Sequence, residues 1–319
     1  MSTGSFVMFV FFIRVGFTTL RRLMEAASKL PEHEMFINDF FDLQNISTSK
    51  GYISKSDYFP KPPFQIEILN LSFSYPGTSK EVLEKIHIKI PKGKTVALVG
   101  GNGSGKTTLV KLLCGFYQPG QGSIFFNESN IENFSLDILW KNISVLFQDY
   151  ILYHTSARDN IWFGDTGTDC HIREIIDSAQ MTGVHDTLKK LPKGYETTLG
   201  NMFSQSAELS LGEWQKLAMA RTFYKKAGFY ILDEPTSSLD LQTEEEMFKK
   251  FETLTRKNTT LLISHRLSTI LLADYIYVLD QGKIVEEGRH EELINQKGMY
   301  SDLFESQLNR LGQKPVNYI

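Results

Sequence analysis

Short apolar stretches along residues 64–290 predict strands of two kinds. Five mainly apolar runs are typical of strands that are buried on both faces of a parallel sheet; they occupy residues 95–99, 144–147, 229–232, 260–263 and 275–279. Alternating apolar and polar residues, which are typical of strands with one buried face, occupy residues 64–68, 69–75 and 86–90. Helical patterns separate several of the runs. This order predicts an α/β fold with a mostly parallel sheet and an antiparallel β flank.

The alternation changes phase between Ile68 and Leu69. Ile66 and Ile68 share one parity, whereas Leu69, Leu71 and Phe73 share the other. Because a slip of one residue moves every following side chain to the opposite face of a sheet, the chain must absorb an extra residue at this point. We therefore predict a bulge or a bend between two strand segments.

An uncharged run near the N-terminus predicts a helix of a different kind. Residues 6–13 read FVMFVFFI, and the apolar segment from Phe6 to Leu20 is about 15 residues long, short of the roughly 20 that span a bilayer. A core helix at the chain end and a membrane-inserted helix both fit this run, and its four phenylalanines favour the membrane. Arg14, Arg21 and Arg22 follow the run, so the positive-inside rule places the rest of the chain in the cytoplasm. A secretory signal fits poorly, because no basic residue precedes the run and no small-residue cleavage site closes it.

The sequence after this run predicts the domain organisation. A helical period continues past the arginines to Leu30, and residues 45–63 have the Ser, Thr, Gly and Pro content of a linker. We therefore expect an N-terminal helical segment at 1–44, a linker at 45–63, a globular domain at 64–310 and a C-terminal tail at 311–319.

Composition narrows the class of protein. Hydrophobic residues at 41% and charged residues at 22% are ordinary globular values, which excludes wholesale disorder. The formal net charge of -3 gives no basic nucleic-acid footprint. A mean hydropathy of -0.21 excludes a polytopic membrane protein but allows one membrane segment. The two cysteines, Cys114 and Cys170, lack CxxC spacing, which excludes a disulfide scaffold and a cysteine zinc site and fits a reducing compartment.

A glycine-rich segment directly follows the predicted buried strand at 95–99. Residues 99–109 read VGGNGSGKTTL and match the pattern GxxxxGK[ST]. Glycines let backbone amides point inward around a phosphate chain, and the helix that begins near Gly105 directs its free N–H groups toward the same anion. Lys106 can reach the β- and γ-phosphates, and the Thr107 hydroxyl can bind Mg²⁺. A chance glycine-rich loop is the alternative, which the flanking strand and apolar helix disfavour. The predicted phosphate-binding residues are Gly100, Gly101, Asn102, Gly103, Ser104, Gly105, Lys106, Thr107 and Thr108.

An acidic pair ends the buried run at 229–232. Asp233 and Glu234 follow this run directly, and the carboxyl ends of strands are where open α/β sheets bind ligands. Asp233 is predicted to hold Mg²⁺, directly or through water, and Glu234 to orient or deprotonate the attacking water. An isolated Asp-Glu pair is usually a solvated loop. Its combination with a phosphate loop favours a catalytic role.

These segments resemble the ATP-binding domain of ABC transporters of the exporter type, over roughly residues 64–300. The resemblance implies a P-loop NTPase core with a helical subdomain, ATP as the ligand and Mg²⁺ as the cofactor. Tyr75 in FSYPG resembles the aromatic residue that stacks on adenine, and Gln148 in LFQDY resembles the glutamine that contacts Mg²⁺. His265 in LLISHR resembles the switch histidine that contacts the γ-phosphate, and the stretch SSLD that ends at Asp240 resembles the loop that contacts the partner domain. Alone, each has an ordinary alternative as a strand aromatic, a surface glutamine or a strand-end histidine.

The segment LSLGEWQ, residues 209–215, resembles the signature motif that closes on the ATP of the partner subunit through Ser210 and Gly212. The same stretch is also a helix start, because Ser210 and Glu213 form an S-x-x-E capping box. The family pattern is LSGGQ, from which Leu211 and Glu213 depart. Leu211 either points away from the ligand or crowds the loop, and Glu213 either adds negative charge near the phosphate or turns back toward its own helix.

The N-terminal segment completes the resemblance. Residues 1–44 resemble the last transmembrane helix of an exporter subunit and its cytosolic extension, which implies that the sequence is the C-terminal part of a longer subunit. The implied function is ATP hydrolysis that drives export across the cytoplasmic membrane, with the ATPase domain on the cytoplasmic side. The implied partners are a second ATPase domain, identical or homologous, and transmembrane helices supplied elsewhere, with no nucleic acid.

Two other functions stay open at this point. A non-transport ABC ATPase, for instance one that acts on nucleic acid, is disfavoured by the apolar N-terminus and the net charge of -3. A module that binds ATP without turnover has support only from Leu211.

Overall fold

The computed structural model describes residues 3–45, 59–202, 206–239, 243–244, 247 and 258–310. Contacts divide the chain into two units, Met1–Gly51 and Tyr52–Ile319. This division falls inside the predicted linker, most of which lies outside the described ranges, as does the predicted tail at 311–319. The domain boundaries therefore stay a prediction.

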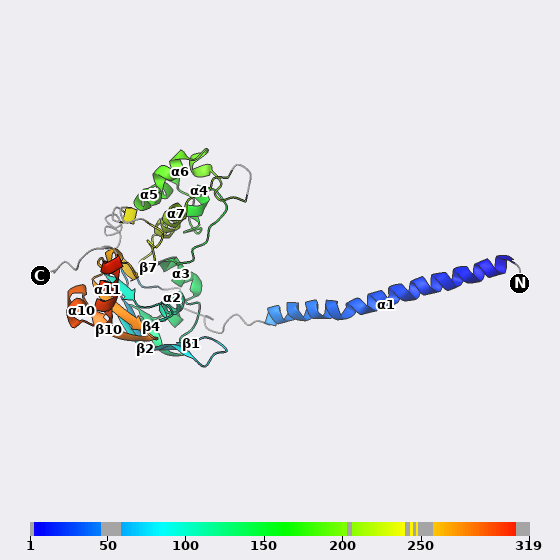
Figure 1. Cartoon of the computed structure of the whole chain (residues 1–319), viewed down its shortest axis with the longest axis horizontal. Coiled ribbons are helices and arrows are strands. Elements are labelled where there is room, and N and C mark those ends of the chain that lie inside the picture. The colour runs from blue at the N-terminus through cyan, green and yellow to red at the C-terminus, as the bar shows by residue number, and fades with distance from the viewer. Residues whose placement is uncertain are drawn as a thin grey trace. The chain divides into compact units, whose positions relative to one another are not determined.

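The first unit contains a single long helix, α1, which spans Thr3–Asn45 (Figure 1). The expected N-terminal helix is confirmed, and it continues through Pro31 to Asn45. Its described side chains are all exposed within this unit. By length and composition alone, Thr3–Asp42 qualifies as a membrane-spanning segment, and it is the one helix in the described part of the chain that does.

A six-stranded sheet forms the centre of the second unit. Its strand order is β10-β9-β3-β8-β7-β6, and all neighbours pair in parallel except β9 and β10. The predicted mostly parallel sheet is confirmed, and every predicted buried run is one of its strands. The strands span Thr95–Val99 (β3), Ile143–Leu146 (β6), Phe229–Asp233 (β7), Thr259–Ile263 (β8), Tyr275–Asp280 (β9) and Lys283–Gly288 (β10).

A second sheet of four antiparallel strands is the predicted flank. Its order is β2-β1-β4-β5, with Ile66–Ser74 (β1), Glu81–Ile90 (β2), Gln121–Phe126 (β4) and Ser129–Asn130 (β5). The predicted bulge is confirmed, because the β1–β2 register shifts between Ile68 and Leu71 and Asn70 has φ 50°. Gly122 lies opposite with φ 83°, and a Cβ there would approach Asn70 O to 2.3 Å.

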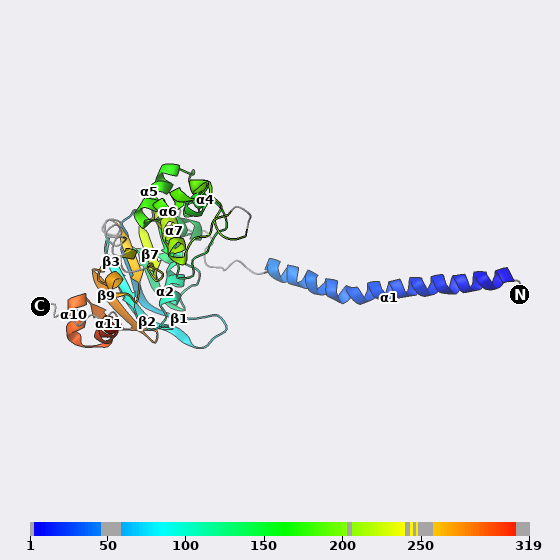
Figure 2. The same ribbon diagram turned by 45° about the horizontal axis from the view of Figure 1, so that its top comes forward.

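Helices cover the sheets and form a separate subdomain. The helices α4 to α7 gather at one end of the unit, and β1, β2 and β4 lie at the other (Figures 1 and 2). The helices α4 to α7 have their own apolar core around Trp214 and Leu217, which confirms the helical subdomain. The helices are α2 (Lys106–Leu113), α3 (Leu136–Asn142), α4 (Ala157–Trp162), α5 (Ile172–Thr182), α6 (His185–Lys190), α7 (Leu211–Tyr224), α9 (Leu267–Ile270), α10 (His290–Gln296) and α11 (Met299–Arg310), with short 3₁₀ turns at Ile131–Asn133 and Gly194–Glu196.

An aromatic cluster lies where the described part of the second unit begins. The ring of Phe59 lies 4.4 Å from Phe134 and 5.3 Å from Phe64, centroid to centroid. Phe59 therefore packs on the globular core, although it falls within the stretch predicted as linker. The composition of residues 45–63 does not distinguish this last aromatic residue from the Ser- and Pro-rich chain around it.

Candidate functional site

The predicted phosphate loop, the acidic pair and His265 lie at one edge of the six-stranded sheet. The phosphate loop follows β3, Asp233 ends β7, Glu234 follows it, and His265 follows β8. Because β7, β8 and β3 run parallel, their carboxyl ends meet at the same edge. The fold thus brings together segments that are far apart in the sequence.

The phosphate loop has the backbone conformation that its glycines allow. Gly103 and Gly105 have φ 76° and 113°, in the left-handed region where a side chain is strained. A Cβ at Gly105 would also lie 2.7 Å from a methyl carbon of Leu83. Helix α2 starts at Lys106 without a side-chain cap, so the first N–H groups of the helix face the loop.

The Lys106 ammonium lies across this loop. Its Nζ donates to the carbonyl oxygens of Gly100 and Gly101 at 2.9 and 2.8 Å and lies 3.4 Å from Ser104 Oγ. Partial burial lowers the pKa of Lys106, against the opposing effect of the nearby carboxylates of Glu234 and Asp233. Lys106 therefore belongs to the same cluster of charged side chains as Asp233 and Glu234.

The two carboxyl groups are buried and incompletely paired. Asp233 is 3% exposed and Glu234 is 8% exposed. Asp233 Oδ2 and Glu234 Oε2 have no hydrogen-bond partner among the described residues. Burial, with the charge of Glu234 as a second cause, raises the pKa of Asp233 to about 6. Buried carboxylate oxygens left without a protein donor fit a divalent cation, and hard oxygen donors are the ligands that Mg²⁺ prefers.

Glu234 is held in an unusual backbone conformation. Its φ of 52° lies in the left-handed region, which costs free energy for a residue with a side chain and is frequent at functional sites. Glu234 N donates to Ile263 O at 2.8 Å, and Gln215 Nε2 donates to Glu234 O at 3.0 Å. The side chain then receives the Nδ1–H of His265 at Oε1, 2.7 Å away. This hydrogen bond is the main cause that raises the pKa of His265.

Tyr75 and Gln148 flank the loop region from other elements. The Tyr75 hydroxyl and Thr108 Oγ1 lie 3.0 Å apart, and the Tyr75 ring packs edge-on against Tyr117. Tyr75 is thus fixed beside α2, the helix that follows the phosphate loop. Gln148 is exposed in the turn after β6, and Thr107 is exposed at the start of α2, so both side chains are accessible to a ligand.

The signature-like segment starts helix α7. Ser210 Oγ accepts from Glu213 N, and Glu213 Oε2 accepts from Ser210 N at 2.8 Å, which confirms the capping box. Of the alternatives for Glu213, the structure shows the carboxylate turned back to its own helix. Leu211 is 64% exposed and points away from the protein interior. Gly212 lies close to the loop after Glu234, since a Cβ there would approach Ser238 O to 3.1 Å. Asp240 lies outside the described residues.

Three further residues organise the site, and the sequence motifs do not assign them. Gln215 is 1% exposed and joins Glu234 O, Ser237 Oγ and Ser238 N. Arg266 donates to Glu244 Oε2 at 2.7 Å and to the Ser237 carbonyl oxygen at 2.9 Å. Gln215 could have been singled out from the sequence, because its polar amide lies on the apolar face of a helix. The contact between Arg266 and Glu244 has no local sequence signal.

Comparison with known proteins identifies the family. The family model described as "ABC transporter" matches residues 83–237. Heavy metal tolerance factor 1 of Caenorhabditis elegans is 35% identical over 316 residues, which is 99% of this chain and 39% of that protein. The ATP-dependent lipid A-core flippase of Syntrophus aciditrophicus is 43% identical over 248 residues, 78% of this chain and 40% of that protein.

A solved structure supports the same relationship. The structure of a bacterial Atm1-family ABC exporter with ATP bound matches with a TM-score of 0.79 and 29% identity, over 87% of this chain and 48% of that one. The chain thus spans about two fifths of the length of the two curated relatives. The order of motifs, the two-sheet fold with its helical subdomain and these relatives agree: the chain contains an ATP-binding domain of the ABC transporter family, and its relatives are ABC exporter subunits.

Proposed function

We propose that this chain binds Mg²⁺-ATP at the edge of the six-stranded sheet and hydrolyses it to drive export across a membrane. The observation that carries the proposal is the arrangement of charge around the phosphate loop. One ammonium group, two buried carboxyl groups with unpartnered oxygens and one histidine converge from the ends of β3, β7 and β8. General phosphoryl-transfer chemistry needs these groups for positioning and charge neutralisation.

Each residue has a proposed task in hydrolysis. The amides of residues 100–105 and the Lys106 ammonium bind the phosphate chain, and Tyr75 stacks on the adenine. Asp233, Thr107 and Gln148 would hold Mg²⁺, which supplies charge neutralisation at the β- and γ-phosphates when bound. Glu234 Oε1 is engaged by His265, so its free oxygen, Oε2, is the one that orients water. Water attacks the γ-phosphorus, the bond to the β-phosphate oxygen breaks, and the water proton passes to Glu234.

The signature residues serve a second copy of the domain in this proposal. Ser210 and Gly212 lie at the start of α7, whose N-terminal N–H groups suit a phosphate, and the exposed Leu211 lies between them. Two domains, identical or homologous, would therefore enclose two ATP molecules, with Asp240 in the contact between them. Hydrolysis should then rise more steeply than linearly with protein concentration, and strictly linear activity would contradict composite sites.

The helix α1 supplies the proposed membrane attachment. Its apolar side chains are exposed from Phe6 onward, and its length and composition suit a membrane span. We propose that it corresponds to the last transmembrane helix of an exporter subunit, with the ATPase domain on the cytoplasmic side. Transport would require further membrane helices around a cavity, because one helix can anchor a domain but cannot line a path.

The phosphate loop offers a direct test of nucleotide binding. Lys106→Ala in the full chain should lose most ATP affinity in equilibrium dialysis, because the phosphate charge then lacks its counter-cation. Lys92→Ala is the matched control, since Lys92 is exposed in the turn before β3. Unchanged affinity of the Lys106→Ala chain would show that the loop does not bind phosphate.

A further inference from the structure

Helix α11, the last helix among the described residues, packs against the segment that carries His265. A small, mainly apolar cavity separates α11 from the ends of β3 and β8, with Gly100, Ser264 and Leu303 among the residues that line it. Tyr300 of α11 is fully buried against this region, and its hydroxyl is hydrogen-bonded to His290 at 2.8 Å. Helix α11 is thus packed on the domain, next to both the phosphate loop and the segment that carries His265.

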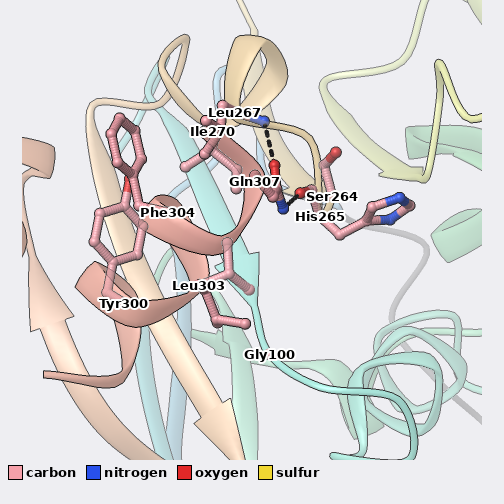
Figure 3. Close-up of a pocket in the computed structure, with 10 residues that line it drawn as sticks. Gly100, Ser264, His265, Leu267, Ile270, Tyr300, Leu303, Phe304 and Gln307 are labelled. Carbon is pink, nitrogen blue, oxygen red and sulfur yellow. Dashed lines mark hydrogen bonds between the residues drawn. The ribbon is translucent and has the colours of Figure 1, made fainter. Parts of the chain in front are cut away.

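One polar side chain of α11 reaches the backbone of the histidine segment. Gln307 Oε1 accepts from Leu267 N at 3.1 Å, and Gln307 Nε2 donates to the carbonyl oxygen of His265. Figure 3 shows the Gln307 amide between these two backbone groups, with the His265 imidazole pointing away from α11. A single amide therefore fixes the backbone on both sides of Arg266.

Neither backbone group belongs to the strand ladder. β8 ends at Ile263, before His265, and Leu267 is the first residue of the short helix α9, whose N–H has no intrahelical partner. The donor and the acceptor of Gln307 thus satisfy groups that secondary structure leaves open. Without the amide, the segment between β8 and α9 depends on Arg266 and on the side chain of His265 itself.

The other end of α11 is anchored independently. The carboxylate of Glu286 on β10 accepts from Met299 N, at the start of the helix, at 2.5 Å and from Tyr300 N at 3.0 Å. Because a carboxylate at a helix N-terminus is favourable both as a cap and toward the helix dipole, this fixes where α11 begins. Gln307 is thus carried on a helix that has an anchor outside the site, at Glu286 on β10.

We propose that Gln307 is a positioning residue for His265: from α11 it holds the backbone of the histidine segment so that the imidazole meets Glu234. This inference rests on the proposed ATP hydrolysis at the site. Gln307 touches neither the phosphate loop nor the carboxyl groups in the described contacts, so it acts through the backbone of His265. An error of about 1 Å in the position of a catalytic group can cost up to about 100-fold in rate, which makes a backbone clamp at this point significant.

The test compares steady-state hydrolysis by variants of the full chain. Gln307→Ala should lower kcat about tenfold while KM for ATP stays within about twofold, because the nucleotide-binding residues are untouched. Gln307→Glu keeps the acceptor for Leu267 N–H but sets a carboxylate oxygen against the carbonyl oxygen of His265, so kcat should fall at least as far as in Gln307→Ala. Glu305→Ala is the control, since Glu305 is exposed on the same helix. Amide exchange at Leu267 should accelerate in Gln307→Ala and stay unchanged in Glu305→Ala.

The outcomes separate this inference from the function on which it rests. A parent chain that does not hydrolyse ATP overturns the proposed function, and the inference with it. An active parent whose Gln307→Ala variant keeps kcat within about twofold overturns the inference alone. The same holds if KM rises in step with the fall in kcat, or if Glu305→Ala loses as much activity, because either result indicates general disorder of α11.

Discussion

His265 Nδ1 lies 2.7 Å from Glu234 Oε1, although the two residues are 31 positions apart in the sequence. The parallel pairing of β7 with β8 places their carboxyl ends side by side and thereby allows this contact. The contact leaves Glu234 Oε2 without a partner among the described residues. Oε1 of Glu234 is therefore used to orient the carboxylate through His265, and Oε2 is available to contact water in the proposed hydrolysis.

Glu234→Gln should keep ATP binding and reduce hydrolysis by at least about 100-fold, because an amide cannot accept the proton of the attacking water. The ATP-bound form should accumulate as a dimer. Phosphate release and size-exclusion chromatography with ATP check the two parts. Hydrolysis at the parent rate would remove Glu234 from the proposed role.

The raised pKa of Asp233 predicts that, without Mg²⁺ and nucleotide, the folded domain is less stable at neutral pH than near pH 4. Its pKa is raised from 3.8 to about 6 by burial, so between these values the folded state holds a proton that the unfolded state has lost. Stability therefore falls as pH rises from about 4 to about 6 and the penalty persists above that range, at up to about 3 kcal/mol for a shift of this size.

The Asp233→Asn variant isolates this effect because asparagine does not ionise. In EDTA its Tm should exceed that of the parent at pH 7.5, and the gap should shrink toward pH 4. Asp177→Asn, at an exposed position of α5, should show no such gap. A variant that is less stable than the parent at pH 7.5 contradicts the prediction.

Leu211→Gly should leave ATP binding by the monomer unchanged, because Leu211 is exposed and lies on the segment proposed to serve the other subunit. The rate of hydrolysis should rise or stay constant, since the change restores the family pattern LSGGQ at that position. Ile172→Gly is the matched control, because Ile172 is also an exposed apolar residue at the first position of a helix. A large fall in activity specific to Leu211→Gly would show that the leucine is part of a working interface.

Glu244→Ala should destabilise the domain strongly. Glu244 is 0% exposed and receives hydrogen bonds from Arg266, Thr236, Ser268 and Thr269. Breaking a buried ion pair costs about 3–5 kcal/mol; because the side chain of Arg266 is 24% exposed, we expect a loss at the lower end of this range, about 3 kcal/mol, which urea unfolding can measure.

The control for Glu244 is Glu174→Ala, which breaks an exposed pair with Lys226 and should change stability little. Equal effects of the two substitutions would contradict the role assigned to the buried network.

A chain that starts at Tyr52 should be soluble without detergent and keep the ATP affinity of the full chain. It lacks α1 but retains Phe59, which packs on Phe134. The full chain should associate with membranes through the segment Phe6–Leu20. Flotation with lipid vesicles compares the two forms, and vesicle binding by the shorter chain would argue against α1 as the anchor.

Much of the fold could be predicted from local pattern. The runs at 95–99 and 229–232 are strands of the larger sheet almost to the residue, because strands buried on both faces exclude polar residues until they end. The phase change at Ile68 predicted the bulge at Asn70 for a similar reason, since a slip in alternation has few other solutions. The phosphate loop was predictable because its glycines are required by backbone geometry.

Contacts between distant side chains could not be predicted in the same way. Gln307 lies in a helix whose sequence gives no indication that its amide reaches the backbone of His265. Glu244 follows a polar stretch that looks solvated, yet tertiary packing buries it completely.

In the proposed dimer, the buried amide of Gln215 links residues that serve different active sites. At the start of α7 lie Ser210 and Gly212, which in the proposed dimer touch the nucleotide of the partner, and one turn later Gln215 holds the backbone of this chain's own Glu234. In that dimer, a shift of α7 toward one nucleotide would be transmitted to the carboxylate proposed to act on the other. The two sites would then not be independent, and hydrolysis should show a Hill coefficient above one in ATP that falls toward one when Gln215 is replaced by leucine.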